Sequence, residues 1–177
     1  MNLAIRKADI EDAAAIAHVH VESWKTTYAG IVSDVFLASL SKEDRTHSWQ
    51  EQILAGNISI FVAEDEKGIF GFAAGGKIRE KLDDYDAELY AIYLLRERQG
   101  QGVGRTLVLT LASVLRAEGL TSMLVWVLEQ NPSVSYYEHL DAVQIARKVI
   151  NIGGADLQEL AFGWASLDRL VAAGNQV

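Results

Sequence analysis

The chain has 177 residues, half of them hydrophobic, and a formal net charge of −8, which is typical of a globular protein with a single domain over residues 1–177. The acidic balance argues against non-specific binding to nucleic acid, which needs clustered Lys and Arg. The absence of cysteine excludes disulfides and thiol chemistry, and the lack of a signal-like or long apolar segment favours a cytoplasmic protein without membrane partners.

The first third of the chain reads as one short strand followed by helices. A strand is expected over residues 3–6 and a helix over 9–28, with Asp9 as its N-cap. Further helices are expected over residues 32–40 and 42–55, and Gly56 ends the second of them.

The remainder of the chain alternates strands with helices. Residues 58–63 and 69–76 predict an antiparallel hairpin, and residues 87–95 a third strand. A helix is expected over residues 103–118, a buried strand over 122–128, and a helix that begins at Asn131 and Pro132. Residues 143–152 and 157–164 predict a closing hairpin. This order indicates an α/β fold, a mixed sheet with helices on its faces.

The most informative motif is Gln-Gly-Gln-Gly-Val-Gly-Arg at residues 99–105, between a predicted strand and a predicted helix. Closely spaced glycines and free amides at a helix N-terminus can hold a phosphate group. A dinucleotide fingerprint would need glycine at Arg105, and a P-loop would need Gly-Lys-Ser/Thr. The alternatives that remain are a different phosphate ligand and a glycine-rich turn without a ligand.

Three segments together resemble the GNAT superfamily of N-acetyltransferases. Residues 88–94 look like its fourth strand, residues 99–104 like its acyl-CoA pyrophosphate loop, and residues 131–138 like its Asn…Tyr-Glu element. The resemblance implies a mixed, mostly antiparallel sheet that is splayed between strands 4 and 5, with helices on both faces. It also implies acetyl-CoA as acyl donor, no metal, an amine acceptor, and a homodimer in which the closing hairpin extends the sheet.

The same resemblance assigns residues that bind the coenzyme. The Leu94 amide is the expected donor to the oxyanion that develops on the thioester. Arg105 either contacts a phosphate or is simply solvated, and Asn131 caps a helix, contacts the pantetheine arm, or does both. The full expected set is Leu94, Leu95, Arg96, Gln99, Gly100, Gln101, Gly102, Val103, Gly104, Arg105, Thr106, Asn131 and Tyr137.

Acetyl transfer to an amine also needs a base and an acid. Glu88, inside an apolar strand, is the candidate base, and the alternative is a solvated carboxylate at the start of that strand. Tyr137 is the candidate acid that protonates the departing thiolate. Arg96 and residues 139–142 depart from the family pattern, and the second departure leaves the orientation of Tyr137 open.

Other aromatic and histidine residues have less specific roles. Trp24, Tyr28 and Glu88 are expected to line the acceptor pocket, whereas Tyr136, Trp49, Trp126 and Trp164 are expected in the core. His18 and His20 lie two residues apart and do not form a zinc pair, so both are expected at the surface or in packing.

The sequence therefore predicts an acetyl-CoA-dependent N-acetyltransferase that acts on a primary amine of a small molecule or peptide by direct attack in a ternary complex. The alternative from another class is a noncatalytic module that senses acyl-CoA. A nucleotide-binding protein is disfavoured by the two failed motif spacings.

Overall fold

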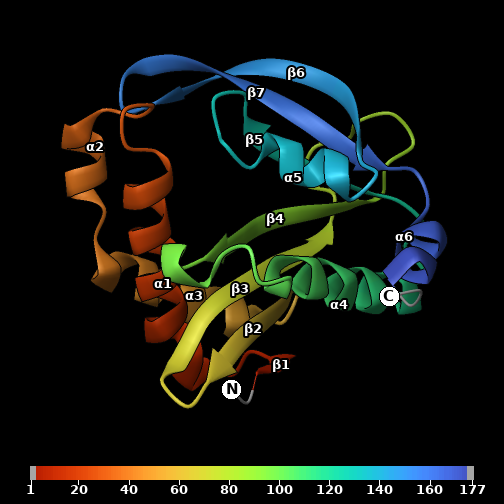
Figure 1. Ribbon diagram of the computed structural model, residues 1–177, viewed down its shortest axis with the longest axis horizontal. Helices are drawn as coiled ribbons and strands as arrows, with labels where there is room; N and C mark the ends of the chain where they lie inside the picture. Colours follow the sequence, from red (N-terminus) through yellow and green to blue (C-terminus); the bar gives the residue numbers. More distant parts are fainter. Residues whose placement is uncertain (1–2, 175–177) are drawn as a thin grey trace.

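The computed structural model describes residues 3–174, and Figure 1 shows its central sheet with helices on either side. The strands are β1 (Ala4–Lys7), β2 (Ser59–Asp65), β3 (Gly68–Lys77), β4 (Ala87–Leu94), β5 (Met123–Leu128), β6 (Val143–Ile152) and β7 (Ala155–Trp164). The helices are α1 (Ala13–Thr27), α2 (Asp34–Ser39), α3 (Lys42–Ala55), α4 (Val103–Ala117), α5 (Val134–His139) and α6 (Leu167–Gly174), with 3-10 turns at Ile10–Asp12 and Arg96–Arg98.

The sheet is mixed, as predicted. Its strand order is β1-β2-β3-β4-β5-β7-β6, and within the described residues the pair β4–β5 is parallel while all other neighbours are antiparallel. The parallel pairing is limited to Ala87–Leu89 of β4 and Met123–Val125 of β5. Beyond Leu89 the two strands separate, which confirms the predicted splay.

A bulge in β4 changes which side chains face which layer. Leu89 pairs with Gly75 and Ala91 pairs with Ala74, so Tyr90 has no direct partner in β3. An extra residue of this kind shifts the alternation of side chains by one. Leu89 therefore packs below α4, whereas Ala91 and Tyr93 face α1 on the other side of the sheet.

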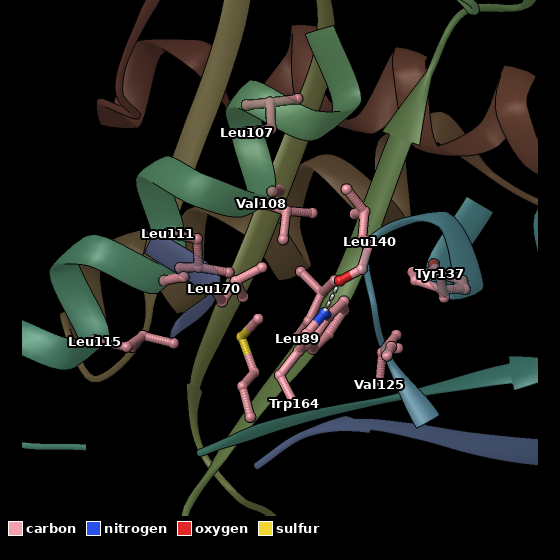
Figure 2. Close-up of a cluster of buried hydrophobic side chains, with 14 of the residues drawn as sticks. Leu89, Leu107, Val108, Leu111, Leu115, Val125, Tyr137, Leu140, Trp164 and Leu170 are labelled. Atoms are coloured by element: carbon pink, nitrogen blue, oxygen red, sulfur yellow. Dashed lines mark hydrogen bonds between the residues drawn. The ribbon is translucent and has the colours of Figure 1, made fainter. Parts of the chain in front are cut away.

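The larger core lies between α4 and the sheet. The α4 side chains Leu107, Val108, Leu111 and Leu115 are fully buried in it, and Figure 2 shows Val108 and Leu111 on the side of the helix towards Leu89. This helical spacing places one continuous apolar face against the sheet. At the edge of the core the Trp164 indole donates a 2.7 Å hydrogen bond to the Leu140 carbonyl.

A second core lies on the opposite face of the sheet. There α1 and α3 contribute Ile16, Val19 and Trp49, which pack against Val62 and Phe72. Helices therefore cover both faces, as predicted. Trp49 and Trp164 are buried as expected.

Some predicted boundaries need correction. The segment expected as one helix over residues 9–28 is a 3-10 turn followed by α1, and Asp9 caps the turn. The helix expected from Asn131 begins at Val134, because the Asn131 carboxamide oxygen accepts a 2.8 Å hydrogen bond from the Ser133 amide and forms a turn first. Helix α6 was not predicted.

The glycine-free turn after α5 has a simple structural basis. Asp141 adopts a left-handed conformation, with φ of 59°, which aspartate tolerates better than most residues. The Tyr137 carbonyl accepts hydrogen bonds from the amides of Leu140 and Ala142, so the turn closes without glycine.

No helix between residues 3 and 174 combines the length and the hydropathy that a membrane span requires.

Candidate active site

A cavity of about 430 Å³ opens where β4 and β5 separate. One wall comes from β4 and the glycine loop, and the other from β5 and the start of α5, while α1 closes one end. The lining residues are Ser23, Thr27, Tyr28, Tyr90, Ala91, Ile92, Tyr93, Leu94, Arg98, Gln99, Gly100, Gly102, Val103, Gly104, Arg105, Val125, Trp126, Val127, Asn131, Pro132, Ser133, Tyr136 and Tyr137.

The glycine loop presents backbone donors to this cavity. Gly100 and Gly102 have φ of 73° and 80°, a left-handed conformation that glycine adopts without strain. A Cβ at either position would meet no atom within 4 Å, so the space above the loop is open. No described residue accepts a backbone hydrogen bond from the amides of residues 100–105. Together with the N-terminus of α4, these amides fit a phosphate or pyrophosphate group.

Arg105 lines the cavity but is already held by the chain. Its Nη2 donates a 3.1 Å hydrogen bond to the Ala173 carbonyl near the end of α6. This exposed contact places the guanidinium beside the loop and leaves both expected roles of Arg105, phosphate contact or solvated side chain, open. Its positive charge also opposes the effect of burial, which raises the pKa of Tyr136.

The Leu94 amide points into the opening between the strands. The Leu95 amide donates to the Phe70 carbonyl in β3, so alternation along the strand directs the Leu94 amide the other way, towards β5. The Leu94 carbonyl faces the same side, where it accepts hydrogen bonds from Ser23 Oγ at 3.3 Å and Gln99 Nε2 at 3.1 Å. The amide is thus a fixed backbone donor on the cavity wall.

Three tyrosines from three elements line the cavity together. Tyr28 follows α1, Tyr93 lies on β4 and Tyr137 lies on α5. The Tyr93 and Tyr28 hydroxyls interact, and the Trp24 indole donates a 3.0 Å hydrogen bond to Tyr93. Burial is the main cause that raises the pKa of all three phenols, so each keeps its proton at neutral pH.

Tyr136 also lines the cavity, although the sequence indicated a core position. Its hydroxyl is buried without a hydrogen-bond partner in residues 3–174. It lies close to Gly104, where a Cβ would be 3.2 Å from the Tyr136 oxygen. Glycine at this position therefore lets α4 approach the tyrosine.

Glu88 is buried rather than solvated, with 3 % of its surface exposed, and it does not line the cavity. Its carboxylate forms an ion pair with the Arg79 guanidinium and accepts a 3.1 Å hydrogen bond from the Arg79 amide. A buried carboxylate needs such partners. Glu88 lies two residues before the lining residue Tyr90.

The structure brings together most of the predicted site. The predicted residues that line the cavity are Leu94, Gln99, Gly100, Gly102, Val103, Gly104, Arg105, Asn131, Tyr137 and Tyr28, and those outside the lining are Leu95, Arg96, Gln101, Thr106, Trp24 and Glu88. Trp24 still acts on the site through its hydrogen bond to Tyr93.

Sequence reasoning missed the side of the cavity formed by Tyr90, Tyr93 and Trp126. Trp126 stands in a nearly continuous apolar run and was expected in the core, yet it is only half-buried. Val125 and Val127 pack into the core beneath α4, so Trp126 projects from the opposite face of β5 and lines the cavity. No local signal in the run itself distinguishes Trp126 from its buried neighbours.

Comparison with known proteins identifies the family. The model of the acetyltransferase (GNAT) family matches residues 20–141, more than half of the chain. The chain is a member of this family. It is 45% identical over 175 residues to an uncharacterized N-acetyltransferase, YuaI, of Bacillus subtilis, covering 98% of this chain and 99% of that protein. It is 31% identical over 139 residues to a spermidine N(1)-acetyltransferase of Thermoplasma acidophilum, covering 74% of this chain and 81% of the relative.

Solved structures agree with this assignment. The PaiA N-acetyltransferase from Thermoplasma acidophilum in complex with coenzyme A has a TM-score of 0.70 and 27% identity, with 90% of this chain and 98% of that chain covered. YncA from Salmonella typhimurium with acetyl-CoA has a TM-score of 0.72 and 25% identity, with 95% of each chain covered. The protein is thus a GNAT-type N-acetyltransferase that uses acetyl-CoA as acyl donor.

The residues present fit this coenzyme. The open glycine loop and the free amides suit its pyrophosphate, and the slot between β4 and β5 exposes unpaired backbone for its extended arm. Within residues 3–174 no group of three or more potential ligands is placed to hold a metal ion.

Proposed function

We propose that the protein transfers the acetyl group of acetyl-CoA to a primary amine of a small molecule or peptide, by direct attack while both substrates are bound. The observation that carries this proposal is the continuity of one cavity from the glycine loop to the aromatic end at Tyr28, Tyr90 and Trp126. Holding both reactants in one cavity supplies much of the rate acceleration through proximity. An amine acceptor also agrees with the activity named for the Thermoplasma relative.

The composition of the cavity lining supports direct attack by the amine. The chain contains no cysteine, and the described lining includes no histidine. A thiol nucleophile, or a hydroxyl activated by a histidine, is therefore absent from the described wall. The amine itself is the nucleophile in this proposal.

The Leu94 amide and Tyr137 have separate roles. When bound, acetyl-CoA supplies an activated thioester. The Leu94 amide, held by the strand, donates a hydrogen bond to negative charge on a carbonyl oxygen placed in the slot. Tyr137, whose phenol stays protonated, donates the proton that the departing thiolate needs.

Proton removal from the amine is assigned to Glu88. Because Arg79 holds the carboxylate away from the cavity lining, Glu88 requires a bridging water to reach the amine. The role rests on the position of Glu88 beside Tyr90 and on the negative charge it brings to that end of the site.

The experiment that tests this function is isothermal titration with acetyl-CoA, with NAD and ATP as controls, followed by an amine screen that detects released thiol. Selective binding of acetyl-CoA and thiol release that depends on an amine are expected. Binding without transfer to any amine would instead favour an acyl-CoA sensor. Failure of a well-folded protein to bind acetyl-CoA would contradict the loop assignment.

We also propose that residues 1–177 act as one acetyltransferase domain and that two copies associate through β6. This strand is at the edge of the sheet and exposes Val143 and Val149. An exposed edge with apolar side chains favours pairing with another strand. Light scattering after size-exclusion chromatography should give the mass of a dimer, and Val149→Lys should shift it towards that of a monomer.

A further inference from the structure

Two aromatic rings on the cavity wall each make a cation–π contact with a basic side chain. The Lys148 ammonium lies 4.1 Å from the centroid of the Trp126 ring, and the Arg79 guanidinium lies 4.5 Å from that of Tyr90. Both rings line the cavity, from the two strands that separate. A cation within about 6 Å of a ring face is attracted by its quadrupole. Each of the two lining rings therefore already holds one cation of the chain, and neither Arg79 nor Lys148 is itself part of the lining.

The aromatic end lies away from the core below α4. Val125 and Val127, the neighbours of Trp126 on β5, pack into that core, so Trp126 points to the opposite face of the sheet. Tyr28 lines the same cavity from α1. A group bound against Trp126 would therefore lie at the other end of the opening between β4 and β5 from the glycine loop.

Three carboxylates interact with the two cations on these rings. Lys148 pairs directly with Glu159 in the β6–β7 register and forms a 3.0 Å ion pair with Glu80. Glu159 is half-buried, and burial raises the pKa of its carboxyl group while Lys148 opposes this effect. With Glu88, three carboxylates face the two cations Arg79 and Lys148.

The two cations differ in how firmly they are held. Arg79 pairs with the buried Glu88 and stacks on Tyr90, so its removal would leave an unpaired buried charge. Lys148 stands on a flexible stem at the edge strand, its side chain is 36 % exposed, and its ion-pair partner Glu80 is 75 % exposed. Lys148 can therefore move into solvent at low cost, provided that another cation replaces it.

We propose that Trp126 and Glu159 bind a second ammonium group of the acceptor, and that Lys148 occupies this subsite in the free protein. The inference rests on the proposed function, because the first amine is the one that is acetylated. Exchange of one ammonium for another keeps the charge beside Glu159 unchanged. The acceptor class is thus an aliphatic chain with at least two amines.

The test compares acceptors that differ by one charge. Binding of 1,4-diaminobutane and 4-aminobutan-1-ol, and of 1,3-diaminopropane and 3-aminopropan-1-ol, is measured by titration calorimetry with the protein saturated with CoA. In Lys148→Met the internal cation is removed while the stem is kept. The preference for diamine over amino alcohol should then rise by about five- to tenfold, the range of a cation–π contact.

Two further variants complete the design. Arg147→Met removes a neighbouring cation on β6 that pairs with Glu129 at 3.4 Å, and it should leave the preference unchanged. Adding Trp126→Leu to Lys148→Met should abolish the gain. An unchanged or lower diamine preference in Lys148→Met would overturn the proposal.

Binding and transfer separate this inference from the proposed function. Diamine-selective binding without acetyl transfer would retain the subsite and contradict the function. Acetyl transfer with no effect of Lys148→Met on diamine preference would retain the function and overturn the subsite.

Discussion

Asn131 Nδ2 donates a 3.1 Å hydrogen bond to the Tyr28 hydroxyl and so links the turn before α5 to the end of α1. Both residues are buried and both line the cavity. The same Asn131 side chain accepts a hydrogen bond from the Ser133 amide. One carboxamide therefore organises the α5 turn that leads to Tyr137 and also holds the α1 wall in place.

This link predicts energetic coupling between the two residues. Tyr28→Phe leaves the buried Asn131 amide without its acceptor, which should lower the free energy of unfolding by about 1–3 kcal/mol. Asn131→Ala should cost more, because it also removes the acceptor of the Ser133 amide, and the double variant should cost clearly less than the sum of the two single variants. Urea unfolding of the four proteins measures the coupling. Strict additivity would show that the contact contributes nothing to stability.

Gly102→Asp should abolish coenzyme binding. A Cβ at this position meets no atom within 4 Å, so the carboxylate can extend into the open space above the loop and repel an anionic group there. Gly119→Asp is the matched control, because Gly119 also has a positive φ and open space but lies at the other end of α4. Both variants carry similar backbone strain, and only Gly102→Asp should lose acetyl-CoA affinity by calorimetry. Equal affinities would contradict the loop assignment.

Tyr137→Phe should lower the rate of acetyl transfer by about 100-fold, the usual contribution of a general acid. Coenzyme affinity should stay within about a factor of two, since the ring packing against Phe162 is retained. Tyr136→Phe is the control from the adjacent position, which also lines the cavity. Single-turnover measurements distinguish them, and a larger loss in Tyr136→Phe would transfer the acid role to that residue.

Glu88→Gln should slow transfer by about 100-fold and leave coenzyme affinity unchanged, because Glu88 does not line the cavity. The amide keeps the shape and can still accept hydrogen bonds from Arg79, so a folding defect is not expected. Circular dichroism checks the fold, and thiol release follows the rate. Full activity would remove Glu88 from the mechanism and leave it as the buried partner of Arg79.

The fold was largely predictable because its signals are local. Helix α3 has the predicted bounds of residues 42–55, and Gly56 ends it as the sequence indicated. The structure adds the N-cap, because the Ser41 side chain accepts a hydrogen bond from the Asp44 amide. Gly153 and Gly154 likewise define the β6–β7 turn. Helix α6 gives a weaker signal, since its buried stripe of Leu167, Leu170 and Val171 spans little more than one turn.

The site was predictable only where a motif carries it. The glycine loop is contiguous in sequence, so one motif predicted it, and all of residues 99–105 except Gln101 line the cavity. The ion-pair partner of Glu88 was not predicted. Arg79 lies in the connection after β3 and comes close to Glu88 only through the pairing of β3 with β4. The partial exposure of Trp126 depends on what packs against the face of β5 opposite α4, which no single segment encodes.

His20 provides a prediction about acid stability. Its ring is stacked on Tyr93 at 5.1 Å and lies near Trp24, Trp49 and Phe72, and its Nδ1 has no hydrogen-bond partner within residues 3–174. Burial lowers the pKa of His20 to about 3. In the unfolded chain the pKa is about 6.5, so the unfolded state binds the proton first as pH falls.

The contribution of neutral His20 to the free energy of unfolding is therefore fully present above about pH 6.5. It is lost progressively as the pH falls towards 3. One such group changes the free energy of unfolding by at most about 1.4 kcal/mol per pH unit, so a loss of about 1–2 kcal/mol between pH 6.5 and pH 5 is expected. His20→Phe should remove that part of the slope, whereas His18→Gln, on the exposed side of α1, should retain it. Urea unfolding at several pH values gives the three curves, and parallel curves for wild type and His20→Phe would contradict the assignment.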